Sequence, residues 1–222
     1  MAEEVERPLS PIILIRHAQS LHHVTDLTGG WTDTGLTELG RQQAAALAER
    51  LKDELGGRSV RCVCSALKRA AETADWIARA TGFEPRFDPG LKEYNNGLAA
   101  GKTRQEADRM MAPRTEPRVD WRPYPQAETW REFYGRVAHA MERLTRDPGP
   151  LLVVTHGGTI GIVVAWWLGL EAERLDRVSF PVAPASLSVL RVNRWGEHTL
   201  ERLNDTAHLQ AQGLTYPIFA ED

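Results

Sequence analysis

The chain has 222 residues, which is enough to bury the core of one α/β domain and does not require a second domain. It carries 27 lysines and arginines against 30 aspartates and glutamates, a net charge of -3, so we expect neither nucleic acid nor an anionic membrane as a partner. The longest apolar stretch, near Ile160 to Leu170, is about half the ~20 residues of a membrane span. Because Met1 to Pro8 lacks the apolar core of a signal peptide, we expect a single cytoplasmic domain over residues 1–222.

The first predicted element is a buried strand in the segment Pro11 to Ile15. Its continuous apolar run, rich in β-branched residues, is typical of a parallel sheet covered on both faces. Arg16 and His17 follow at its carboxyl end. Ligands of such sheets bind outside the carboxyl ends of the strands, so we expect Arg16 and His17 to lie at a binding edge.

A polar loop follows from Leu21 to Gly35. Glycine permits a backbone to approach a ligand closely, and an indole can form a wall, so we predict Gly30 and Trp31 as substrate contacts. His22 and His23 are adjacent, and because histidine is a common metal ligand we consider a metal site here. Neighbouring residues rarely ligate one ion, and no helical cluster of ligands supports them, so we predict no metal here.

The next elements alternate between helix and strand. Leucines at four-residue spacing predict a helix over 37–55, and an apolar run predicts a strand over 59–64. Ser65 is then expected as the N-cap of a helix that ends at Thr81 and carries Arg69 in its first turn. These elements bring Arg69 close to the end of the second strand.

The middle of the chain is less regular. We expect a short strand near 84–87, and the strand-like segment Leu91 to Glu93 places Glu93 at a further strand end. Residues 103–112 can form a short helix. Four prolines between positions 113 and 125 disfavour helix, so residues 99–127 are expected as a surface excursion, either a solvated loop or a lid over the substrate.

The C-terminal third repeats the opening pattern. After an amphipathic helix over 128–146, the apolar run Leu151 to Thr155 predicts a strand that ends at His156, and Gly157 opens an apolar helix. Two final strands over 187–203 suggest a hairpin at the sheet edge. We therefore predict an α/β three-layer sandwich with a mostly parallel central sheet, helices on both faces and an antiparallel edge strand.

If the two strands that end in histidine are neighbours, Arg16 and Arg69 present planar donor forks that match phosphate oxygens. Peptide N–H groups at Gly157, where a helix begins, add donors for the same anion. An imidazole among guanidinium groups is disfavoured as a cation, so His17 should be neutral and nucleophilic near pH 7. A carboxyl group such as Glu93 could protonate the leaving group and then activate water. Glu93 could also be a surface carboxylate in an ion pair.

These residues lie in segments that resemble the motifs of the histidine phosphatase superfamily, the phosphoglycerate-mutase-like enzymes. The resemblance covers about residues 12–170 and keeps the order of the family's motifs, which makes it specific. The similar segments are Arg16-His17-Ala18, Trp31-Thr32-Asp33 with Leu36 to Gly40, Ser65 to Ala70 with Thr73-Ala74, Leu91-Lys92-Glu93, and His156-Gly157-Gly158.

The resemblance implies that His17 is the phosphorylated nucleophile and Glu93 the acid and base. It implies that Arg16, Arg69 and His156 bind the phosphoryl group and that no metal or other cofactor is needed. Ser20 matches a position that contacts phosphate or substrate, and His23 stands where the family commonly has an asparagine that contacts the phosphoryl group. The remaining departures are Ala18 in place of a glycine, Ala99-Ala100-Gly101 in place of Trp-Glu-Gly, and Ala127-Glu128-Thr129, which only loosely resembles Gly-Glu-Ser.

The first functional hypothesis is a metal-independent phosphatase, of the histidine acid phosphatase type, that acts on a small-molecule phosphate ester. One alternative is phosphoryl transfer of the phosphoglycerate-mutase type. The other is a catalytically weak phosphoester-binding module, which the change at Ala99-Ala100 favours. A homodimer is left open as the assembly, and the sequence does not identify the alcohol portion of the substrate.

Overall fold

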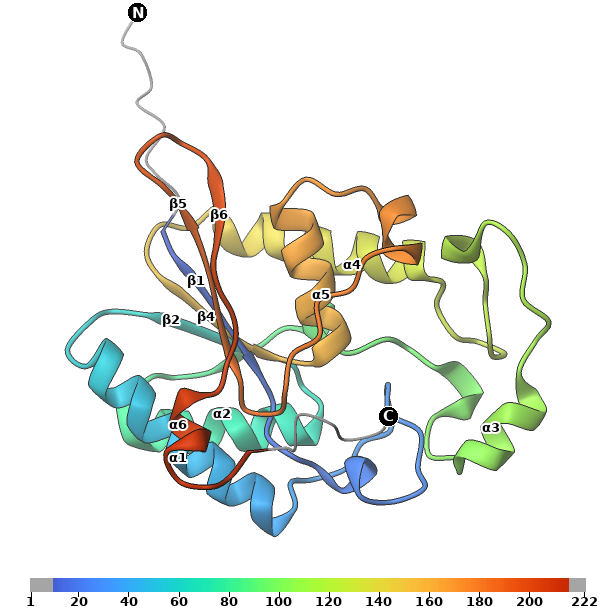
Figure 1. Cartoon of the computed structure of the whole chain (residues 1–222), viewed down its shortest axis with the longest axis horizontal. Helices are drawn as coiled ribbons and strands as arrows, with labels where there is room; N and C mark the ends of the chain where they lie inside the picture. The colour runs from blue at the N-terminus through green and yellow to red at the C-terminus, as the bar shows by residue number, and fades with distance from the viewer. Residues whose placement is uncertain (1–9, 216–222) are drawn as a thin grey trace, which may run out of the picture.

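Within residues 10–215, which the computed structural model describes, six strands form one mixed sheet (Figure 1). The segment Met1 to Pro8, in which we predict no signal peptide, lies outside the described residues. The order across the sheet is β3-β2-β4-β1-β5-β6. The strands are β1 (Ile12–Arg16), β2 (Arg61–Cys64), β3 (Arg86–Phe87), β4 (Leu151–Thr155), β5 (Leu187–Val192) and β6 (His198–Asp205).

The centre of the sheet is parallel and one edge is antiparallel. Strands β1, β4, β2 and β3 pair in parallel, whereas β5 runs antiparallel to β1 and β6 antiparallel to β5. The predicted hairpin at the edge is therefore confirmed, together with the mostly parallel sheet. Connections between the parallel strands pass through helices, as parallel pairing requires.

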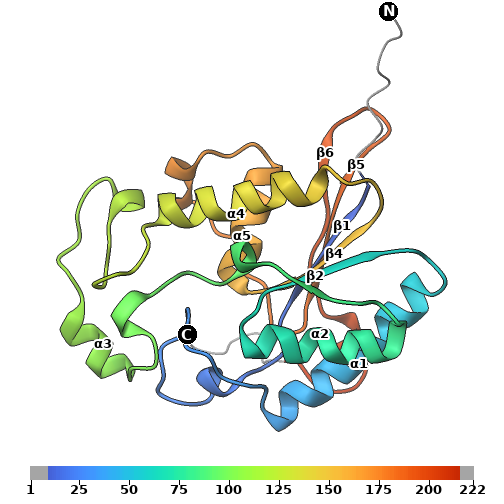
Figure 2. The ribbon, with the colours of Figure 1, turned by 180° about the vertical axis from the view of Figure 1, so that it is seen from behind.

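Helices cover both faces of this sheet, which confirms the predicted three-layer sandwich (Figures 1 and 2). Helices α1 (Glu38–Leu55) and α2 (Lys68–Thr81) pack on one face, and α4 (Trp130–Thr145) and α5 (Gly157–Trp167) on the other. Alternate residues of β1 enter the two cores: Ile13 and Ile15 face α1 and α2, and Ile12 and Leu14 face α4 and α5. Burying each such side chain stabilises the fold by roughly 1.5–3 kcal/mol.

Two expected boundaries are wrong. Helix α2 begins at Lys68 with Leu67 as its N-cap, so Ser65 is not a cap. The segment expected to be strand-like before Glu93 is the 3-10 helix Pro89–Leu91 followed by irregular backbone. Glu93 is thus carried by a loop and does not stand at a strand end.

The excursion over 99–127 contains little regular structure. It holds α3 (Arg104–Met110) and the 3-10 helix Arg118–Asp120. After β6, the short helix α6 (Ala207–Gln210) packs against α1. None of the helices in the described part of the chain has the length and hydropathy needed to cross a membrane.

Candidate active site

His17 and His156 are brought together by the register of two neighbouring parallel strands. Arg16, the last residue of β1, pairs with Thr155, the last residue of β4, and the His17 N–H donates to the Thr155 carbonyl at 2.8 Å. Each strand is followed directly by its histidine. The two imidazole rings therefore meet at the carboxyl edge of the sheet, with 5.1 Å between their centroids.

The hydrogen bonds of His17 define which ring nitrogen holds the lone pair. Its Nδ1 lies 2.8 Å from the Ala18 carbonyl, which can only accept, so Nδ1 carries the proton. Its Nε2 accepts from the Arg69 Nε–H at 3.1 Å. Burial, followed by the positive charge of Arg69, lowers the pKa of His17 well below 6.5. The ring is therefore neutral near pH 7, with the lone pair on Nε2.

Arg69 is fixed by the loop that follows β1. Its Nη1 donates to the Thr32 carbonyl and its Nη2 to the Gly30 carbonyl, both at 2.7 Å. Gly30 has φ of 59°, a left-handed conformation that glycine adopts without strain, and this turn presents its carbonyl to Arg69. Burial lowers the pKa of Arg69 to about 10, so the guanidinium stays charged at pH 7. Its other N–H groups are left for a ligand.

Arg16 and His23 place two donors side by side. The Ser20 N–H donates to His23 Nδ1 at 3.2 Å, so in the neutral ring the proton is on Nε2. Burial lowers the pKa of His23 to about 2, which keeps the ring neutral. Its Nε2 lies 3.0 Å from Arg16 Nη2, which can only donate. An oxygen of a bound anion could accept from both groups, as expected of a phosphoryl site.

His156 directly follows the last residue of β4 and packs edge-on against the His17 ring. It is fully buried, and its Nε2 lies 2.8 Å from the Ser65 hydroxyl. Its Nδ1 is buried and has no hydrogen-bond partner among residues 10–215. Burial and the charge of Arg69 lower the pKa of His156 well below 6.5. Since buried polar atoms normally have a partner, this Nδ1 atom requires a partner, such as a ligand atom or a water molecule, that residues 10–215 do not supply.

Glu93 reaches the same edge from its loop. Its Oε2 accepts from the Gly158 N–H at 2.9 Å, in the first turn of α5, and its Oε1 accepts from the Tyr94 N–H at 2.9 Å. An added Cβ at Gly158 would lie 2.5 Å from Glu93 Oε1, so only glycine allows this approach. The carboxylate is therefore held against the helix that begins directly after His156.

A second set of contacts holds the loop that carries Glu93. Arg136 of α4 donates to the carbonyls of Gly90 at 3.0 Å, Lys92 at 2.9 Å and Glu93 at 3.1 Å. The Trp31 indole N–H donates to the Glu93 carbonyl at 2.7 Å. These hydrogen bonds connect the Glu93 loop to α4 and to the loop that follows β1.

The structure thus gathers most of the predicted site residues at one edge of the sheet. These are His17, His156, Arg16, Arg69, Ser20, His23, Glu93 and Gly157, whose added Cβ would lie 3.4 Å from the Arg16 guanidinium carbon. Gly30 and Trp31 contact residues of the site: the Gly30 carbonyl accepts from Arg69, and the Trp31 indole N–H donates to the Glu93 carbonyl. Their contact with substrate stays a prediction.

Four residues near the site were not predicted as part of it. Ser65 contacts His156, Arg136 holds the Glu93 loop, and the Thr73 hydroxyl accepts from the Ala18 N–H at 3.1 Å. The His22 ring lies 6.0 Å from the His17 ring. Only Ser65 and Thr73 lie in segments that resemble a family motif, and that resemblance was the one signal that could have indicated them.

The chain belongs to the histidine phosphatase superfamily (branch 1), since the model of this family matches residues 12–206. No group of three or more histidine, cysteine or acidic side chains within residues 10–215 is placed to hold a metal ion.

Relatives within the family carry different names. The chain is 30% identical over 221 residues to the probable phosphoglycerate mutase GpmB of Erwinia tasmaniensis, an alignment that covers 91% of this chain and 96% of the relative. Among solved structures, it resembles a mycobacterial glucosyl-3-phosphoglycerate phosphatase at 26% identity and a TM-score of 0.75, covering 89% of this chain and 100% of the other. It also resembles the alpha-ribazole phosphatase of Shigella flexneri at 27% identity and a TM-score of 0.74, with coverages of 88% and 96%.

Proposed function

We propose that the protein is a metal-independent phosphatase that hydrolyses a small-molecule phosphomonoester through a phosphohistidine at His17. The observation that carries this proposal is the geometry of His17: its Nδ1 faces a carbonyl, which leaves the Nε2 lone pair 3.1 Å from Arg69 Nε and beside the His156 ring. Two similar solved structures named as phosphatases support hydrolysis as the reaction.

In the first step, His17 Nε2 attacks phosphorus and the bond between phosphorus and the leaving oxygen breaks. The two guanidinium groups and His156 bind the equatorial oxygens, on which charge is spread in the transition state. A proton carried by Glu93 goes to the leaving alkoxide, so the carboxyl group ends the step as a carboxylate. Such a positioned acid is worth roughly 10²–10⁴-fold in rate.

In the second step, a water molecule takes the place of the departed alcohol. Glu93, now a carboxylate, accepts a proton from this water as the water oxygen attacks phosphorus. The bond between phosphorus and Nε2 breaks, which releases inorganic phosphate and returns His17 to its neutral form. One carboxyl group therefore serves as acid and then as base.

Turnover of p-nitrophenyl phosphate tests this proposal. We expect wild-type turnover that EDTA does not reduce, and none from His17→Ala. His139, an exposed histidine on α4, provides the matched control, and His139→Ala should keep wild-type activity. Thermal protection by inorganic phosphate without release of nitrophenol would instead identify a phosphoester-binding module, and strong inhibition by EDTA would contradict the metal-independent mechanism.

The names of the curated relatives favour a second candidate, a phosphoglycerate-mutase-type transfer of the phosphoryl group to another hydroxyl. Phosphorus NMR of a reaction with 3-phosphoglycerate separates the two candidates. A phosphatase that accepts this substrate forms inorganic phosphate as the product, whereas a mutase forms 2-phosphoglycerate with little free phosphate.

A further inference from the structure

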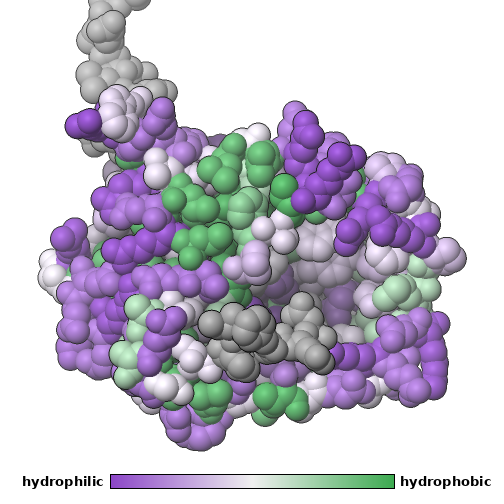
Figure 3. All heavy atoms as spheres, viewed as in Figure 1, coloured by the Kyte–Doolittle hydropathy of each residue, from purple (hydrophilic) through white to green (hydrophobic). Residues whose placement is uncertain are grey.

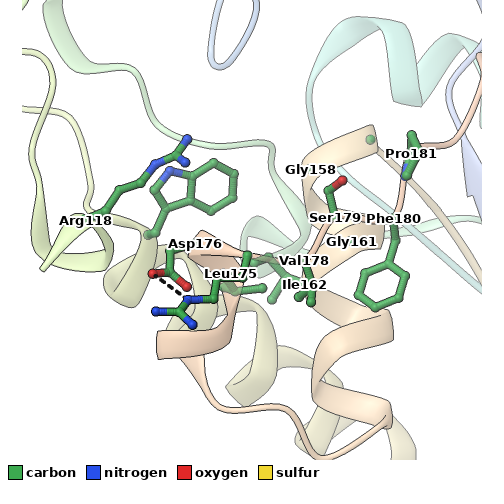
Figure 4. A pocket seen from close by; sticks show the side chains of 13 residues that line it. Arg118, Gly158, Gly161, Ile162, Leu175, Asp176, Val178, Ser179, Phe180 and Pro181 are labelled. Atoms are coloured by element: carbon green, nitrogen blue, oxygen red, sulfur yellow. Dashed lines mark ion pairs between the residues drawn. The ribbon is translucent and has the colours of Figure 1, made fainter.

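A cavity of about 490 Å³ lies beside the first turns of α5. Its walls come from α5, from the segment 175–181 that leads toward β5, from Trp130 of α4 and from Arg118 of the excursion. Its volume falls within the roughly 300–1,000 Å³ of small-molecule sites. In the close-up, Arg118 and Asp176 lie at one end and Phe180 and Pro181 at the other, with Gly161 and Ile162 between them (Figure 4). The molecule is hollowed between α5 and the excursion (Figure 3).

The cavity borders the phosphoryl site at the start of α5. Gly157 and Gly158 line it, and the same two residues contact the site through Arg16 and Glu93. A phosphoryl group held at His17 would therefore have the leaving oxygen, next to Glu93, at the mouth of this cavity. The portion of the substrate beyond that oxygen has the cavity as its nearest enclosed space.

The walls of the cavity are mostly apolar. They include Ile162, which is 1% exposed, with Leu175, Val178 and Phe180. A fifth apolar residue, Trp130, is held in place because its ring stacks on that of Tyr94 at 5.7 Å between centroids. Hydrogen-bonding side chains do line the cavity, but the four charged or hydroxyl residues among them, Arg118, Asp176, Arg177 and Ser179, are all exposed. The apolar part of the wall around Ile162 cannot replace the hydration of a polyhydroxylated group, which disfavours such a group there.

We propose that this cavity binds the leaving group of the substrate and that this leaving group is an aromatic or branched apolar alcohol. The inference rests on the proposed phosphatase function and adds its substrate class. Arg118 and Asp176, at the exposed end, leave room for a polar substituent that stays in contact with water.

Gly161 offers a direct test because an added Cβ there would meet no atom within 4 Å. A leucine at this position would project into the cavity and take the place of the leaving group. Replacing a glycine inside a helix also favours the helix by roughly 1 kcal/mol, so the fold should tolerate Gly161→Leu. Gly135 in α4, an exposed helical glycine with equally open space, supplies the control Gly135→Leu.

The probes are 2-naphthylmethyl phosphate and glycerol 3-phosphate, which are both primary alkyl phosphates and therefore make similar demands on the acid. We expect wild-type kcat/KM to favour the naphthyl ester by ~10-fold or more, the scale of hydrophobic pocket discrimination. Gly161→Leu should reduce this preference by ~10-fold or more, mainly through KM for the naphthyl ester. Gly135→Leu should leave it unchanged.

A second variant keeps the test decisive if Gly161→Leu does not fold. Val178 is 38% exposed, so Val178→Asp should fold while placing a charge on the apolar wall, and it should reduce the same preference. A wild-type preference for glycerol 3-phosphate, or a preference that neither variant changes, would overturn the inference. Absence of turnover with every phosphomonoester would contradict the proposed function itself.

Discussion

The contact between Gly158 and Glu93 gives a sharp prediction for the acid. Gly158 donates its N–H to Glu93 Oε2, and a Cβ at this position would lie 2.5 Å from the other carboxylate oxygen. In Gly158→Ala, the carboxylate must therefore retreat by about 1 Å to reach an ordinary contact distance. The flexible Glu93 side chain can make this movement, so we expect little loss of stability.

The movement should be costly for catalysis. A misplacement of about 1 Å can lower a rate by ~10²-fold, or about 3 kcal/mol of barrier. The loss should depend on the leaving group. An alkoxide needs the proton that Glu93 supplies, whereas p-nitrophenolate is stable without one, so its release loses much less.

The assay compares kcat/KM, which reports the steps up to formation of the phosphohistidine, for an alkyl phosphate and for p-nitrophenyl phosphate in wild type and Gly158→Ala. Gly135→Ala in α4 is the control, because a Cβ at this exposed glycine, unlike one at Gly158, meets no atom within 4 Å. Melting temperatures check that both variants fold. An equal loss on the two substrates, or no loss on either, would refute the role of Gly158 in positioning Glu93.

Three further predictions concern the donors around the phosphoryl site. Ser65→Ala removes the hydroxyl partner of the buried His156 ring and should destabilise the protein by about 1–3 kcal/mol while lowering kcat; wild-type melting and kinetics would argue against it. Arg69→Lys keeps the positive charge, but a lysine cannot donate to the Thr32 and Gly30 carbonyls and to His17 at once. We therefore expect kcat to fall by ~10²-fold or more, and a near-normal kcat would contradict the role of Arg69 in positioning His17 and the phosphoryl group. The pKa values of four site histidines are lowered from 6.5 in the folded protein: His17, His22, His23 and His156. Below pH 6.5 the unfolded chain therefore binds more protons than the folded one. The free energy of unfolding, which is fully present above pH 6.5, should fall at lower pH by up to about 1.4 kcal/mol per pH unit for each ring. Thermal melts between pH 7.5 and 5 measure this slope, which His23→Asn should reduce; a melting temperature that does not fall would be the contrary result.

The central strands could be predicted because their burial leaves a strong pattern. All of β4 and the first four residues of β1 are buried, and both appear in the sequence as continuous apolar runs. Strand β3 has only two residues, both exposed, and therefore has no such pattern. The positions of His17 and His156 could be predicted because each directly follows one of the strands that these apolar runs mark.

The parts of the site that depend on tertiary contacts could not be predicted from periodicity. Arg136 lies on an amphipathic helix, and only the packing of α4 against the loop shows that it holds the backbone around Glu93. Ser65 directly precedes a helical pattern and so resembles an N-cap, but its hydroxyl contacts His156, 91 residues away. The segment 175–181 has neither periodicity nor a motif, and its place in the cavity wall follows from the fold alone.

The most direct test of the account is the identity of the phosphorylated residue. Wild-type enzyme mixed with ³²P-labelled substrate and quenched within milliseconds should carry label that is labile in acid and stable in alkali, on the peptide that contains His17. Glu93→Gln, which slows hydrolysis of the intermediate, should retain this label when a p-nitrophenyl ester is used. Label on another residue, or no label in either protein during steady turnover, would contradict nucleophilic attack by His17.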